Sequence, residues 1–325
     1  MLAATALLAF AVSLAVARLL LTTFRNAVLD RPNARSLHEG PVPRTGGLAV
    51  LAGIGISVAL GARDVWLPVA AAAVLAAVSF ADDLRGLATS LRLAAHLGVA
   101  AALLWYFLAP ADAMLIALLS VAVAWLTNLY NFMDGSDGLA LGMSVFGFGT
   151  YSLAAWMAGD GAIATLCAAT AAAAAAVLVY NFHPAKIFIG DVGSIPLGFL
   201  AGAIGVLGWR NDAWPLWFPL LVFAPFIADA TVTLARRALR REAVWRAHRQ
   251  HYYQRSVRMG FGHARTALGA YVLMLVCAAA ALYGRGQSPA HQATALLCAM
   301  LVLGLTAVWI DMRWARHTRA EGAPT

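Results

Sequence analysis

Residues 128–140 read Asn-Leu-Tyr-Asn-Phe-Met-Asp-Gly-Ser-Asp-Gly-Leu-Ala and form a polar stretch between two mostly apolar runs. The stretch places two carboxylates, Asp134 and Asp137, and two carboxamides, Asn128 and Asn131, where one predicted membrane helix ends and the next begins. Oxygen ligands at this spacing, with glycines that let the backbone bend around them, suit a hard cation that also binds phosphates. The alternative is a polar hairpin that only reverses the chain, although a turn does not require two Asp and two Asn.

The composition predicts an all-α integral membrane protein. Hydrophobic residues make up 62% of the 325 residues and charged residues 12%, whereas soluble domains carry about 25% charged residues. At about 20 residues per crossing, the length allows ten or eleven transmembrane helices, and residues 1–325 are interpreted as one transmembrane domain. The three cysteines all lie in apolar runs and are interpreted as packing residues.

The distribution of arginine predicts the orientation of these helices. Apolar spans are predicted at residues 2–24, 46–62, 65–81, 93–110, 112–127, 139–158, 161–180, 194–209, 214–234, 267–283 and 292–312. With the N-terminus outside, the loops of one face hold nearly all the basic residues, and the opposite loops hold only Arg63, Arg210 and Arg285. Positively charged loops stay in the cytoplasm. The formal charge of +8 is therefore expected to meet anionic lipids and anionic substrates, and no nucleic acid.

Carboxylates gather on the same predicted cytoplasmic face, although the enrichment of cytoplasmic loops in positive charge does not apply to acidic residues. They are Asp82, Asp83, Asp134, Asp137, Asp191 and Asp229. Acidic residues at membrane depth are costly unless they are paired or bind a metal, so loops that deliver carboxylates to one plane predict an active site there.

Two of these loops have an informative local pattern. In residues 181–194, Pro184 is expected to end a helix, and Asp191 lies between two glycines just before the next helix, where a metal–phosphate pair is well placed. Lys186, the only lysine, is a candidate phosphate ligand or a lipid-facing anchor. Asp82 and Asp83 project about 100° apart on a helix, so one is expected to serve the reaction while the other pairs with an arginine, Arg85 or Arg92.

The last long loop is basic and contains His248, His251, Gln254 and Arg255. If helical, these side chains share one face and can donate hydrogen bonds to a sugar or pyrophosphate. The alternative is an amphipathic loop that lies on lipid headgroups. The first loop, which contains Arg44, is predicted only to be ordered and basic.

Together these stretches resemble the polyprenyl-phosphate N-acetylhexosamine-1-phosphate transferase superfamily (glycosyltransferase family 4 type), in particular the branch that initiates O-antigen and common antigen. The resemblance rests on the first loop with Arg44, the Asp82-Asp83 pair, the 128–140 stretch, the Pro184-to-Ser194 stretch and the histidine-containing last loop. It implies transfer of a sugar-1-phosphate from a UDP-N-acetylhexosamine to undecaprenyl phosphate, with release of UMP and dependence on Mg²⁺ or Mn²⁺. It also implies a bacterial inner-membrane enzyme with its active site facing the cytoplasm, and a possible homodimer.

The resemblance also implies roles for single residues. Asp191 and Asp134 are expected to bind the metal, and the catalytic group comprises Asp82, Asp83, Asp134, Asp137 and Lys186. The remaining candidates are expected to bind substrate: Asn128, Asn131, Asn181, Phe188, His248, His251, Arg255 and Arg44. Because a lipid phosphate is already ionised at neutral pH, Asp82 is expected to orient it and not to act as a general base.

The identity of the sugar stays open. The peptidoglycan branch usually has three consecutive histidines in the last loop, which this chain lacks. This favours UDP-N-acetylglucosamine or its 6-deoxy relatives over the muramyl-pentapeptide donor. Three alternatives from other classes are a transporter, a lipid-binding scaffold and a CDP-alcohol phosphotransferase. Finally, three prolines, Pro215, Pro219 and Pro225, predict that the ninth span is broken or kinked, with the hypothesis that it opens a lipid groove.

Overall fold

The computed structural model describes residues 2–24, 28–30, 37, 40–61, 65–244, 246, 248–320 and 322. Within this part the chain is almost entirely helical, which confirms the predicted all-α fold. Two short strands, β1 (Leu29–Asp30) and β2 (Val42–Pro43), pair antiparallel in the first loop.

Every predicted apolar segment lies on a helix. In chain order these are α1 (Leu2–Thr23), α2 (Gly46–Gly61), α3 (Trp66–Arg85), α4 (Thr89–Leu108), α5 (Ala113–Phe132), α6 (Leu139–Met157), α7 (Gly161–Asn181), α8 (Asp191–Arg210), α9 (Trp217–Val222), α10 (Ala224–Leu239), α12 (Gly262–Arg285) and α13 (Pro289–Ala320). The short α11 (Tyr252–Ser256) and a π-helical turn (Val257–Phe261) precede α12. In the described part of the chain, 9 helices are long and apolar enough to cross a membrane, so the protein is a multi-pass membrane protein.

The second and ninth predicted spans differ from the rest. Helix α2 has 16 residues, about 24 Å, which is shorter than the roughly 30 Å of a bilayer core. The ninth segment is broken, as predicted, because α9 ends at Val222 and α10 begins at Ala224. Pro225 lies in the first turn of α10, where a proline is tolerated but cannot continue a preceding helix.

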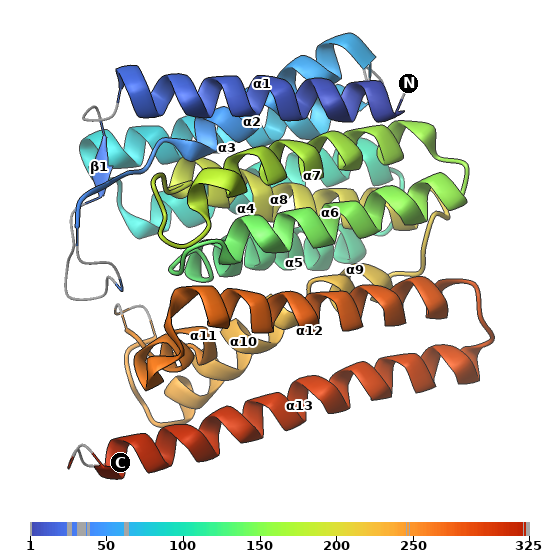
Figure 1. Cartoon of the computed structure of the whole chain (residues 1–325). Coiled ribbons are helices and arrows are strands. Elements are labelled where there is room, and N and C mark those ends of the chain that lie inside the picture. The colour runs from blue at the N-terminus through green and yellow to red at the C-terminus, as the bar shows by residue number, and fades with distance from the viewer. Residues whose placement is uncertain are drawn as a thin grey trace.

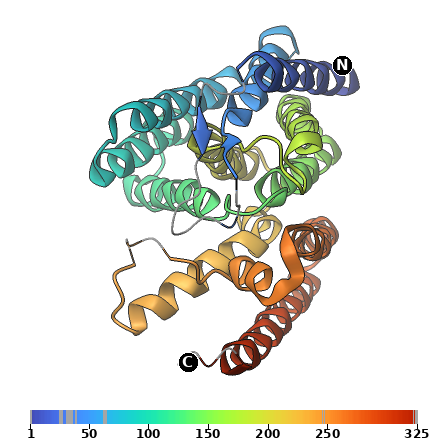
Figure 2. The ribbon, with the colours of Figure 1, turned by 60° about the vertical axis from the view of Figure 1, so that its left-hand side comes forward.

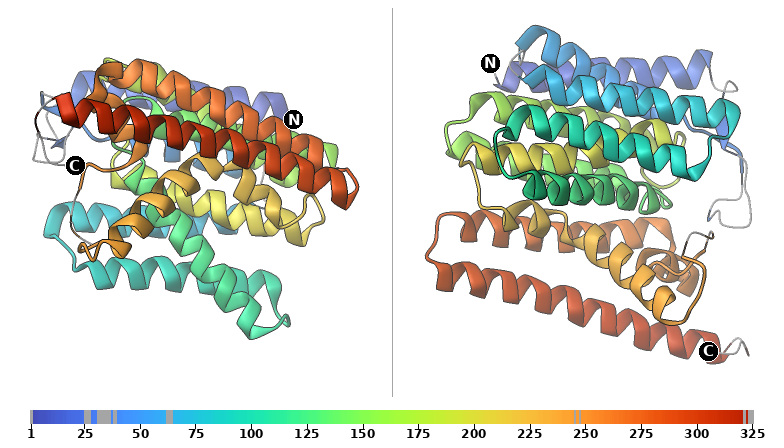
Figure 3. Two further views of the ribbon diagram at one scale, coloured as in Figure 1. Left: turned by 90° about the horizontal axis from the view of Figure 1, so that it is seen from below. Right: turned by 180° about the vertical axis from the view of Figure 1, so that it is seen from behind.

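Helix α8 is the central element of the bundle. It packs against α2, α3, α4, α5 and α6, and nearly all its side chains are buried. Glycines allow this close packing, since a Cβ at Gly198 would meet the Tyr130 side chain at 2.6 Å. Helices α9 to α13 form a second layer below α1 to α8 in Figure 1, and Figure 3 shows α12 and α13 running side by side.

The bundle has one end that carries most of the irregular structure. In Figure 1 strand β1, helix α11 and the C-terminus lie at the left-hand end, and the N-terminus lies at the right-hand end. Figure 2 turns the left-hand end towards the viewer. The sequence-predicted site residues belong to this end, because hydrogen bonds and ion pairs connect its loops to one another.

Candidate active site

Asp191 is the first residue of the central helix α8. The preceding Gly190 has a φ of 63°, in the left-handed region that glycine adopts without steric cost. On α5, Asn131 donates from Nδ2 to the Asp191 carboxylate at 3.4 Å, and its Oδ1 accepts from the Ser194 hydroxyl at 2.9 Å. The unpaired N–H groups and the positive end of the helix dipole favour anionic groups at this place.

Asp134, in the loop after α5, lies within electrostatic range of Asp191. Burial, together with the negative charges of Asp191 and Asp30, raises the pKa of the Asp134 carboxyl well above its usual range. Asp83 also lies within electrostatic range of Asp191. In the part of the chain that the structure describes, no three His, Cys, Asp or Glu residues are arranged to hold a metal ion by themselves. Two carboxylates could hold a hard divalent cation only together with substrate phosphates, and its charge would relieve their repulsion.

Asp82 and Asp83 have different surroundings. The Asp82 carboxylate accepts from the Leu87 backbone N–H at 2.7 Å and pairs with Arg92 at 2.7 Å, so it caps the end of α3. Asp83 pairs with Arg44 of the first loop at 2.5 Å and points towards the group of carboxylates. Sequence reasoning expected one partner among Arg85 and Arg92 for one of the two acids; the structure pairs both acids with arginines.

A strip of backbone joins the first loop to the segment before Asp191. The Phe188 N–H donates to the Pro43 carbonyl at 2.7 Å, and the Phe188 carbonyl accepts from Gly46 N–H at 2.9 Å. Gly47 then donates to the Ile189 carbonyl at 3.0 Å. These bonds hold Arg44 against Gly190, the residue before Asp191, and the Phe188 side chain is half-buried.

Asp137 and Asn181 hold the two loops of the site in place. Asp137 accepts from His183 Nδ1 at 2.7 Å and from the Ala185 N–H at 3.1 Å. Asn181 accepts from the Gly138 N–H at 3.0 Å and donates to the Ile187 carbonyl at 2.8 Å. Because these groups are occupied by the protein itself, the geometry favours positioning roles for both residues over direct contact with substrate.

His263, at the start of α12, completes this support, and sequence reasoning missed it. Its ring lies parallel to that of His183, with centroids 5.3 Å apart, and its Nδ1 is 2.9 Å from the Ser136 hydroxyl. A single histidine near a helix start carries no local pattern that would have singled it out.

In the described part of the chain, no hydrogen bond or ion pair joins Lys186 or Asn128 to these carboxylates. Lys186 is exposed and lines a cleft of about 410 Å³ together with Leu21, Pro43 and Tyr180. It is not among the charges that act on Asp83 or Asp134. Asn128 hydrogen-bonds His96 of α4 at 3.1 Å and the carbonyl one turn earlier in its own helix.

The last loop is connected to the 128–140 stretch through aromatic residues. The Tyr253 hydroxyl donates to the Phe132 carbonyl at 3.0 Å, and the His251 ring stacks on Phe132 at 6.5 Å. Asp229 of α10 accepts from His251 at 3.1 Å and from the Tyr252 N–H at 2.9 Å, which fixes the start of α11. His251 is thereby buried in the support of the loop.

His248 has a free donor for a ligand. Helix α11 begins only at Tyr252, so the predicted single helical face for His248, His251 and Arg255 is wrong. His248 Nδ1 accepts from the Gln250 N–H at 3.3 Å, which leaves the proton on Nε2. Burial and the charges of His251 and Arg237 lower the pKa of His248 to about 4, so the ring is neutral at pH 7.

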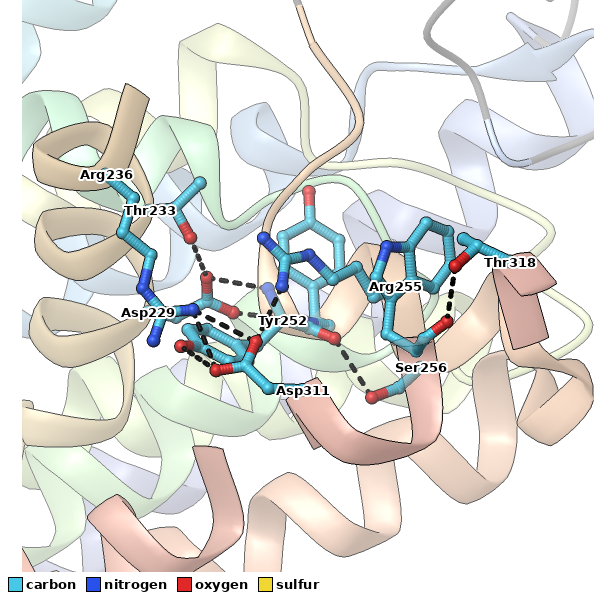
Figure 4. A network of polar contacts seen from close by, with 10 residues as sticks. Asp229, Thr233, Arg236, Tyr252, Arg255, Ser256, Asp311 and Thr318 are labelled. Carbon is cyan, nitrogen blue, oxygen red and sulfur yellow. Dashed lines mark hydrogen bonds and ion pairs between the residues drawn. The ribbon is translucent and has the colours of Figure 1, made fainter. Parts of the chain in front are cut away.

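Asp311 of α13 closes the base of the last loop, and no sequence motif marks it (Figure 4). Its carboxylate pairs with Arg236, before the loop, at 2.8 Å and with Arg255, after the loop, at 2.8 Å. The Tyr252 hydroxyl donates to it at 3.3 Å, and both guanidinium groups lie over the Tyr252 ring. Arg255 is therefore engaged by the protein, and its geometry favours a positioning role.

We expect the Asp311→Asn substitution to loosen this loop. Asparagine keeps the shape but removes the charge that holds two arginines, so the free energy of unfolding should fall by about 2 kcal/mol. Trypsin should also cleave faster after Arg240 and Arg241, which lie inside the loop. Thermal unfolding and timed trypsin digestion measure both effects. Asp212→Asn, at an exposed acid with a φ of 57° that asparagine tolerates, is the matched control; equal digestion of the two variants would contradict the expectation.

Comparison with known proteins shows which family and which relatives the chain is similar to. The model of the family described as Glycosyl transferase family 4 matches residues 65–209, which include Asp82, Asp83, Asp134 and Asp191. A probable undecaprenyl-phosphate N-acetylglucosaminyl 1-phosphate transferase of Bacillus subtilis (strain 168) is 28% identical over 275 residues, 78% of this chain and 76% of the relative.

Two further relatives differ in how much of this chain they match. The undecaprenyl-phosphate alpha-N-acetylglucosaminyl 1-phosphate transferase of Escherichia coli (strain K12) is 26% identical over 279 residues, 78% of this chain and 74% of the relative. The phospho-N-acetylmuramoyl-pentapeptide-transferase of Geobacillus thermodenitrificans (strain NG80-2) is 43% identical, but only over 81 residues, 25% of each chain. This family match and these relatives support a relationship of the chain to the polyprenyl-phosphate N-acetylhexosamine-1-phosphate transferase superfamily.

Proposed function

We propose that the protein transfers N-acetylhexosamine-1-phosphate from a UDP-sugar to undecaprenyl phosphate and releases UMP. The observation that carries the proposal is the group of carboxylates, Asp83, Asp134 and Asp191, beside Arg44 at the N-terminus of α8. Further support comes from two relatives named as N-acetylglucosaminyl 1-phosphate transferases, each similar over about three quarters of its length.

Asp191 and Asp134 would hold Mg²⁺, with Mn²⁺ as a substitute. Mg²⁺ in phosphate-transferring sites is typically held by one or two carboxylates plus substrate phosphates, and these two residues offer that set. When bound, the cation neutralises charge on the pyrophosphate and on the leaving UMP.

The other residues would bring two anionic substrates together. An oxygen of the lipid phosphate attacks the phosphorus that carries the sugar, and the bond to the UMP phosphate breaks. No proton has to be removed, so the work is positioning and neutralisation of charge. Arg44, held by Asp83, lies where it can reach a phosphate, and the His248 Nε2–H can donate to the sugar or pyrophosphate. Asp83 is nearer to this chemistry than Asp82, which caps α3.

The break between α9 and α10 would admit the acceptor. We propose that the prenyl chain lies against α9 and α10 within the bilayer while its phosphate reaches the loops. The excess of arginine at the loop end supports the proposal that this end faces the cytoplasm at a bacterial inner membrane, where UDP-sugars are available. Initiation of O-antigen or a related envelope glycan is the pathway proposed.

The test is a transfer assay with purified protein in detergent. Undecaprenyl phosphate and Mg²⁺ are supplied with UDP-N-acetylglucosamine, UDP-N-acetylfucosamine, UDP-N-acetylquinovosamine or UDP-N-acetylmuramoyl-pentapeptide, and UMP release is followed. We expect release with one of the first three donors, dependent on both lipid phosphate and metal. Release only with the pentapeptide donor would instead assign the peptidoglycan reaction, and no release from any donor by folded protein would refute the proposal.

A further inference from the structure

A second polar cleft lies away from the carboxylates, between the π-helical turn Val257–Phe261 and the C-terminal part of α13. It has a volume of about 310 Å³ and is lined by Met259, Phe261, Arg313, Arg316 and His317. None of the residues that line it takes part in the proposed transfer reaction, so this cleft is independent of the proposed function.

The arginines of this cleft lack negative partners. Arg313 and Arg316 are three residues apart on α13, so two like charges lie side by side on the helix surface, which is unfavourable without a counterion. Arg258 of the π-helical turn adds a third positive charge. In the part of the chain that the structure describes, none of the three pairs with a carboxylate, because the acid of α13, Asp311, is taken by Arg236 and Arg255.

Tryptophans hold two of these guanidinium groups in place. Arg258 lies over the Trp314 ring at 4.8 Å, and Arg313 lies over the Trp309 ring at 5.3 Å. The ring centroids of Phe261 and Trp309 lie 5.7 Å apart, so this aromatic pair connects the two walls of the cleft. Arg258 also donates one N–H to the Arg249 carbonyl at 3.4 Å. An arginine stacked on an aromatic face keeps its remaining N–H groups available for an anion, and tryptophan prefers the level of the lipid headgroups.

The cleft begins where the lipid-facing surface of α13 ends. Large apolar side chains are exposed along the helix up to this point, including Leu301 at 61%, Leu305 at 60% and Met312 at 51%. Acyl chains can cover this apolar surface, and a phosphate one turn further along the helix then meets Arg313 and Arg316. The occupant that matches this sequence of apolar surface, tryptophan and unpaired arginine is a lipid with a negatively charged headgroup.

We propose that this cleft is a binding site for the headgroup phosphate of an anionic phospholipid. A zwitterionic headgroup brings its own positive charge and gains less from three unpaired arginines. Binding would fix the end of α13 against the π-helical turn, next to the residues that Asp311 holds.

The test is native mass spectrometry and thermal unfolding of detergent-purified protein, titrated with phosphatidylglycerol or with phosphatidylcholine. We expect phosphatidylglycerol to bind more tightly and to raise the Tm. The double substitution Arg313→Gln and Arg316→Gln should weaken phosphatidylglycerol binding roughly thirty-fold, since each arginine near a membrane surface contributes about a factor of five. Arg240→Gln with Arg241→Gln removes the same charge from an exposed site nearby and should change binding little.

Met259→Glu tests the same site with both arginines in place, because a carboxylate inside the cleft would compete for them. It should weaken binding of phosphatidylglycerol as well, and it serves if the double variant does not fold. Equal binding of the two lipids to the wild-type protein, or equal loss in the cleft variant and the Arg240/Arg241 control, would overturn the proposal.

Discussion

Replacement of Asp191 by asparagine is expected to lower sugar-1-phosphate transfer about 10³-fold, on the scale seen when one preorganised charge-stabilising group is removed. Asparagine keeps the size of the side chain and can stand in the first turn of α8. It removes the negative charge that, with Asp134, is proposed to hold Mg²⁺. The loss should appear in kcat at saturating Mg²⁺, and UMP release at a series of Mg²⁺ concentrations measures it.

Asp112→Asn is the matched control for this substitution. Asp112 caps the N-terminus of α5 by accepting from the Met114 N–H at 2.8 Å, and asparagine caps a helix equally well. We expect full activity for this variant. If Asp191→Asn kept more than a tenth of the wild-type rate with the same metal dependence, the metal site would have to be sought among other residues.

Gly47→Ala is expected to destabilise the protein and to abolish transfer with it. Helix α2 crosses the start of α8 so closely that a Cβ at Gly47 would lie 2.5 Å from the Gly193 Cα and 2.7 Å from the Ile189 carbonyl oxygen. Backbone cannot rotate away as a side chain can, so the two helices must separate, at a cost of about 3 kcal/mol. The separation would shift Asp191, two residues from Gly193.

Gly55→Ala on the same helix is the control, because a Cβ there meets nothing within 4 Å. Its Tm should be unchanged or slightly higher, since alanine favours helix more than glycine. Thermal unfolding and UMP release should be measured for both variants. A Gly47→Ala protein with the stability and activity of the wild type would show that the crossing of α2 and α8 is looser than the structure has it.

Local patterns were sufficient to predict the helices. Apolar runs of spanning length became helices, and the prolines near residues 215–225 predicted the interruption that separates α9 from α10. The apolar run at 46–62 is counted as a span although its 17 residues correspond to only about 26 Å of helix, close to the length that α2 has. Segment length and hydropathy are properties of one segment at a time. They therefore predict which segments are helices, and the structure has helices there.

Contacts between distant residues account for what sequence reasoning did not find. Asp311 meets Arg236 across 75 residues, and His263 meets Asp137 across 126. Neither pairing leaves a periodic or local signal. The choice between Asp82 and Asp83 also depended on such contacts, since only the positions of Arg92 and Arg44 distinguish the two neighbours.

The position of Asp311 on the last helix sets the order in which the protein can mature. Arg236 and Arg255 are synthesised 75 and 56 residues before the carboxylate that joins them. At about 5–20 residues per second, the ribosome needs roughly 3–11 s to add the later interval. During that time Arg236 and Arg255, at the two ends of the last loop, have no Asp311 carboxylate to pair with. The nascent chain therefore carries all the carboxylates proposed to bind metal, but its last loop is fixed in place only when the final helix enters the membrane.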